Sequence, residues 1–162
     1  PELSQIISST AERDSAGVCM VAPLGKDATT AALELGLDPA RTVAVDPLFG
    51  FQKRFTLMTT PVTKPEVRDA AHALLAAGGV PVSVINDSAG FVAQRVVAHI
   101  VNVGCDIVQM RIAAPEDLDR AVMLGLGYPN GPLAMGATAV HARLVGPGTA
   151  PGIQPPPCLP PE

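Results

Sequence analysis

The sequence predicts an α/β region followed by an all-α region. In the first half, short apolar runs alternate with amphipathic segments, a pattern that favours an α/β layer with mostly parallel strand pairing. After Ile85 the periodicity is helical, and no strand signal occurs between Phe91 and Pro132. The 162 residues are 48% hydrophobic but only 3% aromatic, so one domain or two small ones can bury a core of Ala, Val, Leu and Ile.

Four short runs in the first half have the apolar, β-branched composition of strands. They cover residues 17–22, 41–48, 54–61 and 80–85. Residues 26–37 and 63–79 have helical periodicity instead. In the second of these helices we expect Thr63 to be the N-cap, Pro65 to lie in the first turn and the glycine pair 78–79 to end the helix.

The second half reads as helices. A polar cluster at Asn86, Asp87 and Ser88 can cap the helix predicted over 91–112. Apolar residues recur in that helix every three or four positions, in a stripe wide enough to contact more than one partner, a second subunit included. Residues 114–127 form the next predicted helix, with a proline at its first position and acidic residues in its first turn.

From about residue 137 the sequence becomes rich in proline and glycine, and we expect an extended or disordered tail there. The predicted organisation is therefore an α/β region over 1–87, a helical domain over 88–136 and a tail over 137–162. An alternative for the tail is a truncation or an altered reading frame near residue 137.

Composition excludes several classes of function. The net charge of −4 argues against nucleic acid or an anionic membrane as the main partner. No run reaches the roughly 18 apolar residues of a membrane span, and the first residues do not resemble a signal peptide. We expect a cytoplasmic protein with reduced thiols and no metal site, because its cysteines and histidines are scattered and form no CxxC pair. These residues are Cys19, Cys105, Cys158, His72, His99 and His141.

Motifs for chemistry are missing from the sequence. Neither a GxGxxG fingerprint, nor a P-loop, nor a GxSxG elbow occurs, and "GLGYPNG" follows a helix rather than a strand. The carboxylates Asp46 and Glu66 have no visible partners for acid–base work. Taken alone, the residues predict a fold class without a reaction.

Two separated segments carry a family resemblance. "INDSAGFVAQR" (85–95), followed by "PEDLDRAVMLGLGYPNGPL" (115–133), resembles the junction and the helical C-terminal domain of the 3-hydroxyacyl-CoA dehydrogenases. A weaker similarity extends the match to about residues 17–136, most of all to the C-terminal part of the long phenylacetate-degradation type. The resemblance implies a partial Rossmann-like parallel sheet joined to that helical domain.

The resemblance also assigns positions to the family's active-site residues. The catalytic His corresponds to Asp46, the Glu that orients it to Met58, the active-site Ser to Gly25 and the substrate-facing Asn to Gln94. All four positions depart from the family pattern. Methionine cannot usefully accept an imidazole N–H, and a carboxylic acid is a poor proton carrier at neutral pH. We therefore expect no catalysis and no bound cofactor in this chain.

Two functions remain open. In the first, the chain would be the C-terminal part of an NAD-dependent enzyme that oxidises 3-hydroxyacyl-CoA to 3-oxoacyl-CoA, in β-oxidation of fatty acids or in phenylacetate degradation. An upstream unit would then carry out the chemistry. Alternatively, the chain is a non-catalytic module that dimerises or closes over substrate. The implied partners are an acyl-CoA and a second copy of the chain, bound through the helix over 91–112.

Overall fold

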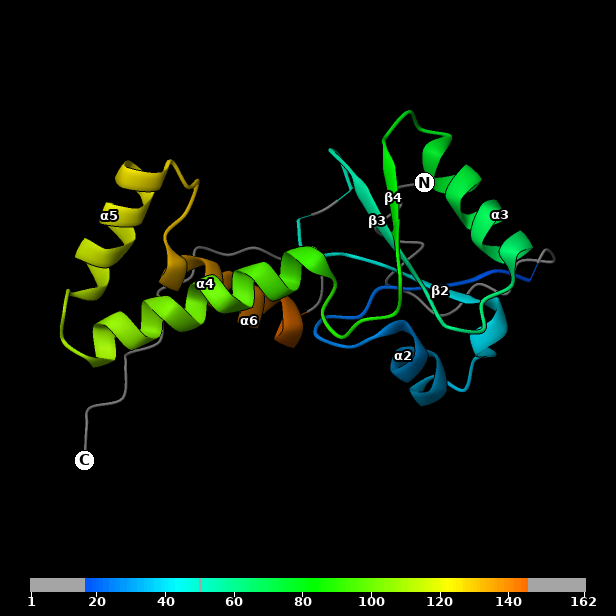
Figure 1. The fold of residues 1–162 in the computed structure, drawn as a ribbon, viewed down its shortest axis with the longest axis horizontal. Helices are drawn as coiled ribbons and strands as arrows, with labels where there is room; N and C mark the ends of the chain where they lie inside the picture. The colour runs from blue at the N-terminus through cyan, green and yellow to red at the C-terminus, as the bar shows by residue number, and fades with distance from the viewer. Residues whose placement is uncertain (1–16, 50, 146–162) are drawn as a thin grey trace. The chain divides into compact units, whose positions relative to one another are not determined.

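The computed structural model describes residues 17–49 and 51–145, except for the side chains of residues 139–145. The chain forms two compact units that divide between Gln94 and Arg95, one turn into helix α4 (Val92–Gln109). All four strands lie in the first unit, and the described part of the second is helical (Figure 1). The predicted class, α/β followed by all-α, is confirmed.

The first unit is built on a four-stranded sheet of order β1-β2-β3-β4. Its strands are β1 (Cys19–Val21), β2 (Thr42–Val45), β3 (Phe55–Thr59) and β4 (Val82–Ile85). The two outer pairs are parallel, as predicted, whereas β2 and β3 are antiparallel, so the sheet is mixed. The connection between β2 and β3 contains no helix, and such a short connection joins antiparallel neighbours.

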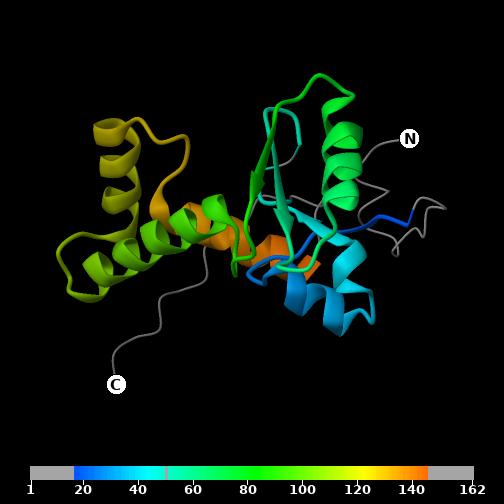
Figure 2. The same cartoon turned by 45° about the vertical axis from the view of Figure 1, so that its right-hand side comes forward.

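Helices cover both faces of the sheet. Successive strand side chains point to opposite faces, which divides the buried apolar residues into two clusters. Helix α3 (Pro65–Ala76) packs in one cluster, and in Figure 2 it lies alongside β3 and β4. The members of this cluster are Val43, Val45, Phe55, Leu57, Val67, Ala71 and Leu75. Helix α2 (Ala28–Glu34) packs in the other, whose members are Val21, Ala28, Ala31, Ala44, Met58 and Phe91.

The strand register aligns one residue from each strand in a row across the sheet. Val21 pairs with Ala44, Ala44 with Met58, and Met58 with Ile85. Val21 and Ile85 are the last residues of the two edge strands. Both edge strands therefore end at the same row, although they run in opposite directions. Hydrogen bonds then join the two segments that follow them, as in the bond from the Gly90 N–H to the Lys26 carbonyl.

The predicted cap of α3 was wrong. The N-cap is Lys64, without a side-chain cap, although Pro65 does lie in the first turn as expected. The Thr63 hydroxyl donates to the Thr42 carbonyl at 3.0 Å and accepts from the Thr60 backbone N–H at 2.8 Å. The Thr63 hydroxyl therefore bonds to backbone groups at the ends of β2 and β3, and it does not cap α3.

The second unit contains the rest of α4 with α5 (Pro115–Leu126) and α6 (Pro132–Val145). The predicted helices over 91–112 and 114–127 are confirmed, and Gly127 ends α5 in the left-handed conformation. Helix α6 continues to Val145, so the expectation of an extended tail from residue 137 was wrong; residues 146–162 lie outside the described part. Within the described residues, no helix is both long and apolar enough to span a bilayer.

Glycines bring α4 and α6 close together within this unit. A Cβ on Gly104 would lie 2.8 Å from the Pro132 Cβ, and one on Gly136 would lie 2.8 Å from a Val101 methyl group. At the start of α6, the Asp119 carboxylate of α5 accepts from the N–H groups of Leu133 (2.9 Å) and Ala134 (3.2 Å). Asp119 thus satisfies two of the unpaired donors of that helix end.

Candidate functional site

Three of the four positions that the resemblance assigns to the active site are joined by hydrogen bonds. The Gly25 N–H donates to Gln94 Oε1 at 2.8 Å, and Gln94 Nε2 donates to Asp46 Oδ1 at 2.8 Å. The same Nε2 also donates to the Pro23 carbonyl at 3.3 Å. The loop after β1, the end of β2 and the first turn of α4 therefore meet at one amide.

This amide lies in a buried environment. The exposed fractions of Gln94 and Asp46 are 9% and 8%. Asp46 Oδ1 accepts a second bond, at 3.0 Å, from the Leu48 N–H. The Gln94 oxygen and both of its N–H hydrogens thus have partners inside the protein, as buried polar groups require.

Gly25 supplies the backbone geometry of this contact. Its φ is +78°, in the left-handed region, where a side chain would be strained. A Cβ here would have no neighbour within 4 Å, so the backbone conformation and not the space calls for glycine. With this conformation the Gly25 N–H bonds to Gln94.

Met58, the fourth position, has a packing role. It is fully buried on β3, in the cluster that contains Phe91. Its sulfur accepts the Ser88 N–H at 3.3 Å, and a thioether is a weak acceptor that cannot exchange a proton. No acid or base stands at this position.

Asp87, predicted to cap the helix that follows it, binds a different helix. Its Oδ1 accepts from the Ala28 N–H at 2.8 Å, and its Oδ2 accepts from both the N–H (3.3 Å) and the hydroxyl of Thr29. These donors lie at the N-terminus of α2. A carboxylate is favourable there because the unpaired N–H groups and the helix dipole carry positive charge.

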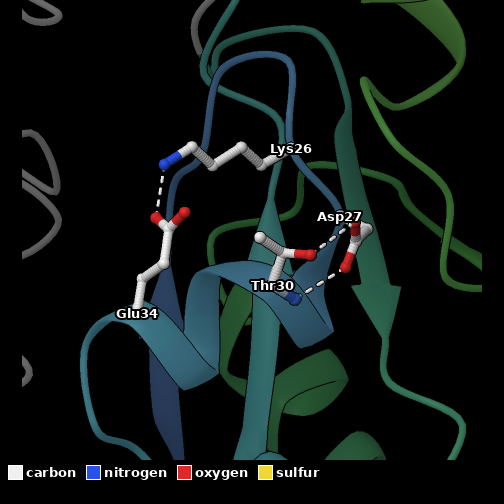
Figure 3. A network of polar contacts seen from close by, with 4 residues as sticks. All are labelled: Lys26, Asp27, Thr30 and Glu34. Atoms are coloured by element: carbon white, nitrogen blue, oxygen red, sulfur yellow. Dashed lines mark hydrogen bonds and ion pairs between the residues drawn. The ribbon is translucent and has the colours of Figure 1, made fainter.

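A second carboxylate, that of Asp27, caps the same end of α2. It accepts from the Thr30 N–H at 2.6 Å and the Thr30 hydroxyl at 2.9 Å (Figure 3). The backbone bond from Thr30 is the largest cause that lowers the pKa of Asp27 below its ordinary value. Lys26 and Glu34 form an exposed ion pair beside this cap (Figure 3).

The junction itself has an unusual backbone. Gly90 and Phe91 both have positive φ, +78° and +41°, and for phenylalanine this is a strained conformation. The Phe91 side chain is only 1% exposed, and the Gly90 N–H donates to the Lys26 carbonyl at 3.3 Å. Burial of this ring holds the strained turn in place.

The helical unit presents apolar surface. An apolar cavity of about 270 Å³ opens between α4 and α5, and Val103 in its wall is 57% exposed. Other residues of its wall are Ile100, Ile107, Leu118, Val122 and Leu126. Along α4 and the residue that follows it, positions 96, 100, 103, 107 and 110 carry apolar residues at alternating steps of four and three, the spacing of a helix-packing stripe.

The described residues contain no group of three or more His, Cys, Asp or Glu that could hold a metal ion. Cys19 and Cys105 are free thiols, and Cys158 lies outside the described residues. His72 is exposed, His99 lies at the cavity, and the His141 side chain is outside the described part.

Comparison with known proteins agrees with this architecture. Residues 90–145 match the model of the 3-hydroxyacyl-CoA dehydrogenase C-terminal domain. The 3-hydroxyadipyl-CoA dehydrogenase of Escherichia coli (strain K12) is 32% identical over 128 residues, which is 79% of this chain and 26% of that protein. Together these matches support the 3-hydroxyacyl-CoA dehydrogenase family for this chain. The family match also continues past residue 136, to the end of α6.

Solved structures show the same fold. The E. coli K12 3-hydroxybutyryl-CoA dehydrogenase superposes with a TM-score of 0.62 at 31% identity, over 79% of this chain and 27% of that one. The (S)-3-hydroxybutyryl-CoA dehydrogenase of Ralstonia eutropha superposes with a TM-score of 0.63 at 20% identity, over 80% of this chain and 50% of that one. The chain spans about a quarter of the length of the first curated relatives that it matches.

The sequence suggests these positions by resemblance, but it does not indicate the groups to which they bond. It shows no partner for Asp46, which bonds to Gln94 from 48 positions away along the chain. It also misses the backbone of Pro23 and Leu48 as part of this network, because main-chain groups carry no sequence signal. The polar residues after Ile85 did indicate a helix cap, but the capped helix was a different one. Asp87 accepts hydrogen bonds from N–H groups of α2, which lie 58 and 59 positions upstream.

Proposed function

We propose that this chain is a non-catalytic C-terminal part of an NAD-dependent 3-hydroxyacyl-CoA dehydrogenase. The observation that supports this most directly is the Gln94 network. The amide that would face substrate in the family spends its hydrogen bonds on Gly25, Pro23 and Asp46. Oxidation of a 3-hydroxyl needs a base for its proton, and the position of the residue that would orient this base is the buried thioether of Met58.

The described residues do not fit NAD. A dinucleotide places its pyrophosphate on the N–H groups at a helix N-terminus that follows a strand. At α2, the helix that follows β1, those groups already bond to the carboxylates of Asp27 and Asp87. Two carboxylates at this point would also repel a pyrophosphate, so we assign hydride transfer to an upstream unit of the parent protein.

The direct test is turnover. The purified chain is mixed with NADH and acetoacetyl-CoA, absorbance at the NADH band is followed, and an active dehydrogenase of the family serves as the positive control. We expect no consumption of NADH and no shift of the melting temperature with NADH. Turnover or clear stabilisation by NADH would contradict the proposal.

A second role, dimerisation through α4, is supported by the apolar stripe. Val96, Val103 and Met110 are 53%, 57% and 65% exposed, and a stripe on one helix can pair with its own copy about a two-fold axis. Size-exclusion chromatography with light scattering tests this. We expect Val103→Glu to convert a dimer into a monomer, while Asn102→Glu, at the adjacent exposed position, leaves the dimer intact. A wild-type monomer at high concentration would contradict this role.

For the parent protein we propose a 3-hydroxyacyl-CoA thioester as substrate, in β-oxidation or phenylacetate degradation in the cytoplasm. The name of the E. coli relative, a 3-hydroxyadipyl-CoA dehydrogenase, favours a dicarboxylic acyl chain. Specificity constants of the parent protein for hydroxyadipyl-CoA and hydroxybutyryl-CoA separate the choices. A preference for hydroxybutyryl-CoA over hydroxyadipyl-CoA would contradict the phenylacetate assignment.

A further inference from the structure

Two segments of the α/β unit are fastened to each other at several points. We call them together the clasp: residues 23–29, after β1, and residues 87–94, after β4. The bonds between them run from Ala28 and Thr29 to Asp87, from Gly90 to Lys26, from Gly25 to Gln94 and from Gln94 to Pro23. The clasp thereby connects segments that follow the two opposite edges of the sheet.

Within the clasp, Gln94 differs from the other contacts. Asp87 satisfies a helix end and Gly90 uses only its backbone, whereas the Gln94 side chain also reaches outside the clasp, to Asp46 after β2. One amide therefore bonds to a loop on one side and to a buried carboxylate on the other. Asparagine at this position would be shorter by one C–C bond, about 1.5 Å, and could not keep both contacts without a shift of the helix.

We propose that Gln94 is a latch that holds the loop of residues 23–25 closed against Asp46. A position that would face a substrate in the family is in this chain an internal fastening. The Gly25 N–H, the Gln94 amide and the Asp46 carboxylate open together, since separating any one leaves a buried polar group without its partner. A closed loop is a property separate from the proposed lack of catalysis, because an inactive site could equally be an open one.

Hydrogen exchange in the intact chain tests the latch. The amide exchange rates of Gly25 and Leu48 are measured by NMR in wild type, in Gln94→Met and in Gln109→Met. Both variants make the same chemical change on α4, but Gln109 is exposed and near the end of the helix. We expect exchange at Gly25 to rise about tenfold or more in Gln94→Met, because the Gly25 N–H loses its acceptor on the buried Gln94 side chain. Gln109→Met should leave it unchanged.

A double-mutant comparison separates the latch from general loosening. Asp46→Ala should raise exchange at Gly25 nearly as much as Gln94→Met, and the double variant should add little to either. Asp46→Asn keeps an acceptor oxygen and should preserve most of the protection. Independent, additive effects of the two single variants would overturn the latch, and so would unchanged exchange at Gly25 in Gln94→Met.

A further variant and a second amide distinguish opening of the latch from global unfolding. If Gln94→Met unfolds, Gln94→Asn retains the amide chemistry with a shorter reach, and the latch predicts loss of protection at Gly25 with the amide of Val43 in β2 still protected. A rise at both amides would overturn the latch. The proposed lack of catalysis is read separately: NADH turnover with a protected Gly25 refutes only the proposed function, and an inactive chain with an unprotected Gly25 refutes only the latch.

Discussion

The α/β unit and the helical unit differ in how completely they bury their apolar side chains. In the α/β unit, Val43, Leu57 and Met58 are fully buried, and helices cover both sheet faces. In the helical unit, the buried apolar side chains among the described residues are those of Val97, Leu118 and Pro132, while Leu124 is 80% exposed. The α/β unit can therefore hold its fold by its own core, whereas the helical unit depends on close backbone contacts and leaves apolar surface for a partner.

Both units nevertheless use the same device to fix a helix end. Asp87 binds the N-terminus of α2 and Asp119 binds the N-terminus of α6, each with both carboxylate oxygens. In each case the carboxylate comes from a different element than the helix it caps. The units thus differ in how much apolar surface they bury, and they share the way in which polar groups join their elements.

The largest difference is expected for the same substitution in the two units. Leu57→Ala removes a fully buried side chain of the sheet and should cost about 2–5 kcal/mol of unfolding free energy. Leu124→Ala removes an exposed one and should change it by less than about 0.5 kcal/mol. Urea denaturation at low protein concentration measures both. Similar losses would mean that the helical unit is covered as completely as the sheet.

Glycine packing is the next test, inside the helical unit. Gly104→Ala would place its Cβ 2.8 Å from that of Pro132, and the overpacking should cost about 1–3 kcal/mol. Gly125→Ala in α5, where a Cβ meets nothing within 4 Å, should be neutral or stabilise the helix by up to about 1 kcal/mol. Thermal unfolding of the two variants gives the comparison. A neutral Gly104→Ala would show that close approach of α4 to Pro132 is not essential.

The shared capping device predicts a smaller effect. Asp119→Ala should cost about 1 kcal/mol, because the N–H groups of Leu133 and Ala134 lose their acceptor, and Asp119→Asn should recover most of it. Urea midpoints and amide exchange at Leu133 measure the change. Equal losses in the alanine and asparagine variants would point to charge, rather than to the hydrogen bonds, as the source of stability.

The smallest expected effect is a dependence on pH at the cap of α2. Folding lowers the pKa of Asp27, so this carboxylate stabilises the fold above its unfolded pKa, near 3.8, and the contribution fades as the pH falls through the lower folded value. Asp27→Ala should cost about 1 kcal/mol at pH 7, and its difference from wild type should shrink below about pH 4. A difference that stays constant down to pH 2.5 would rule out this linkage.

Periodicity and turn residues in the sequence determined the elements. The strands, the helices over 63–79 and 114–127, and the switch from α/β to all-α follow from local preferences of the chain. The resemblance then selected Gly25, Asp46, Met58 and Gln94, and three of these positions proved to be hydrogen-bonded. Local patterns suffice for these features because backbone propensity and the burial of one face act over a few residues.

Tertiary structure decided the partners. The antiparallel pairing of β2 with β3, the reach of Asp87 to α2, the engagement of Thr63 by the strand ends and the extension of α6 to Val145 did not follow from the sequence. Hydrogen bonds between residues far apart in the chain depend on where the sheet brings their segments. That is why the resemblance could assign Gln94 to the family's substrate-facing position, while its bonds to Gly25 and Asp46 could be seen only in the fold.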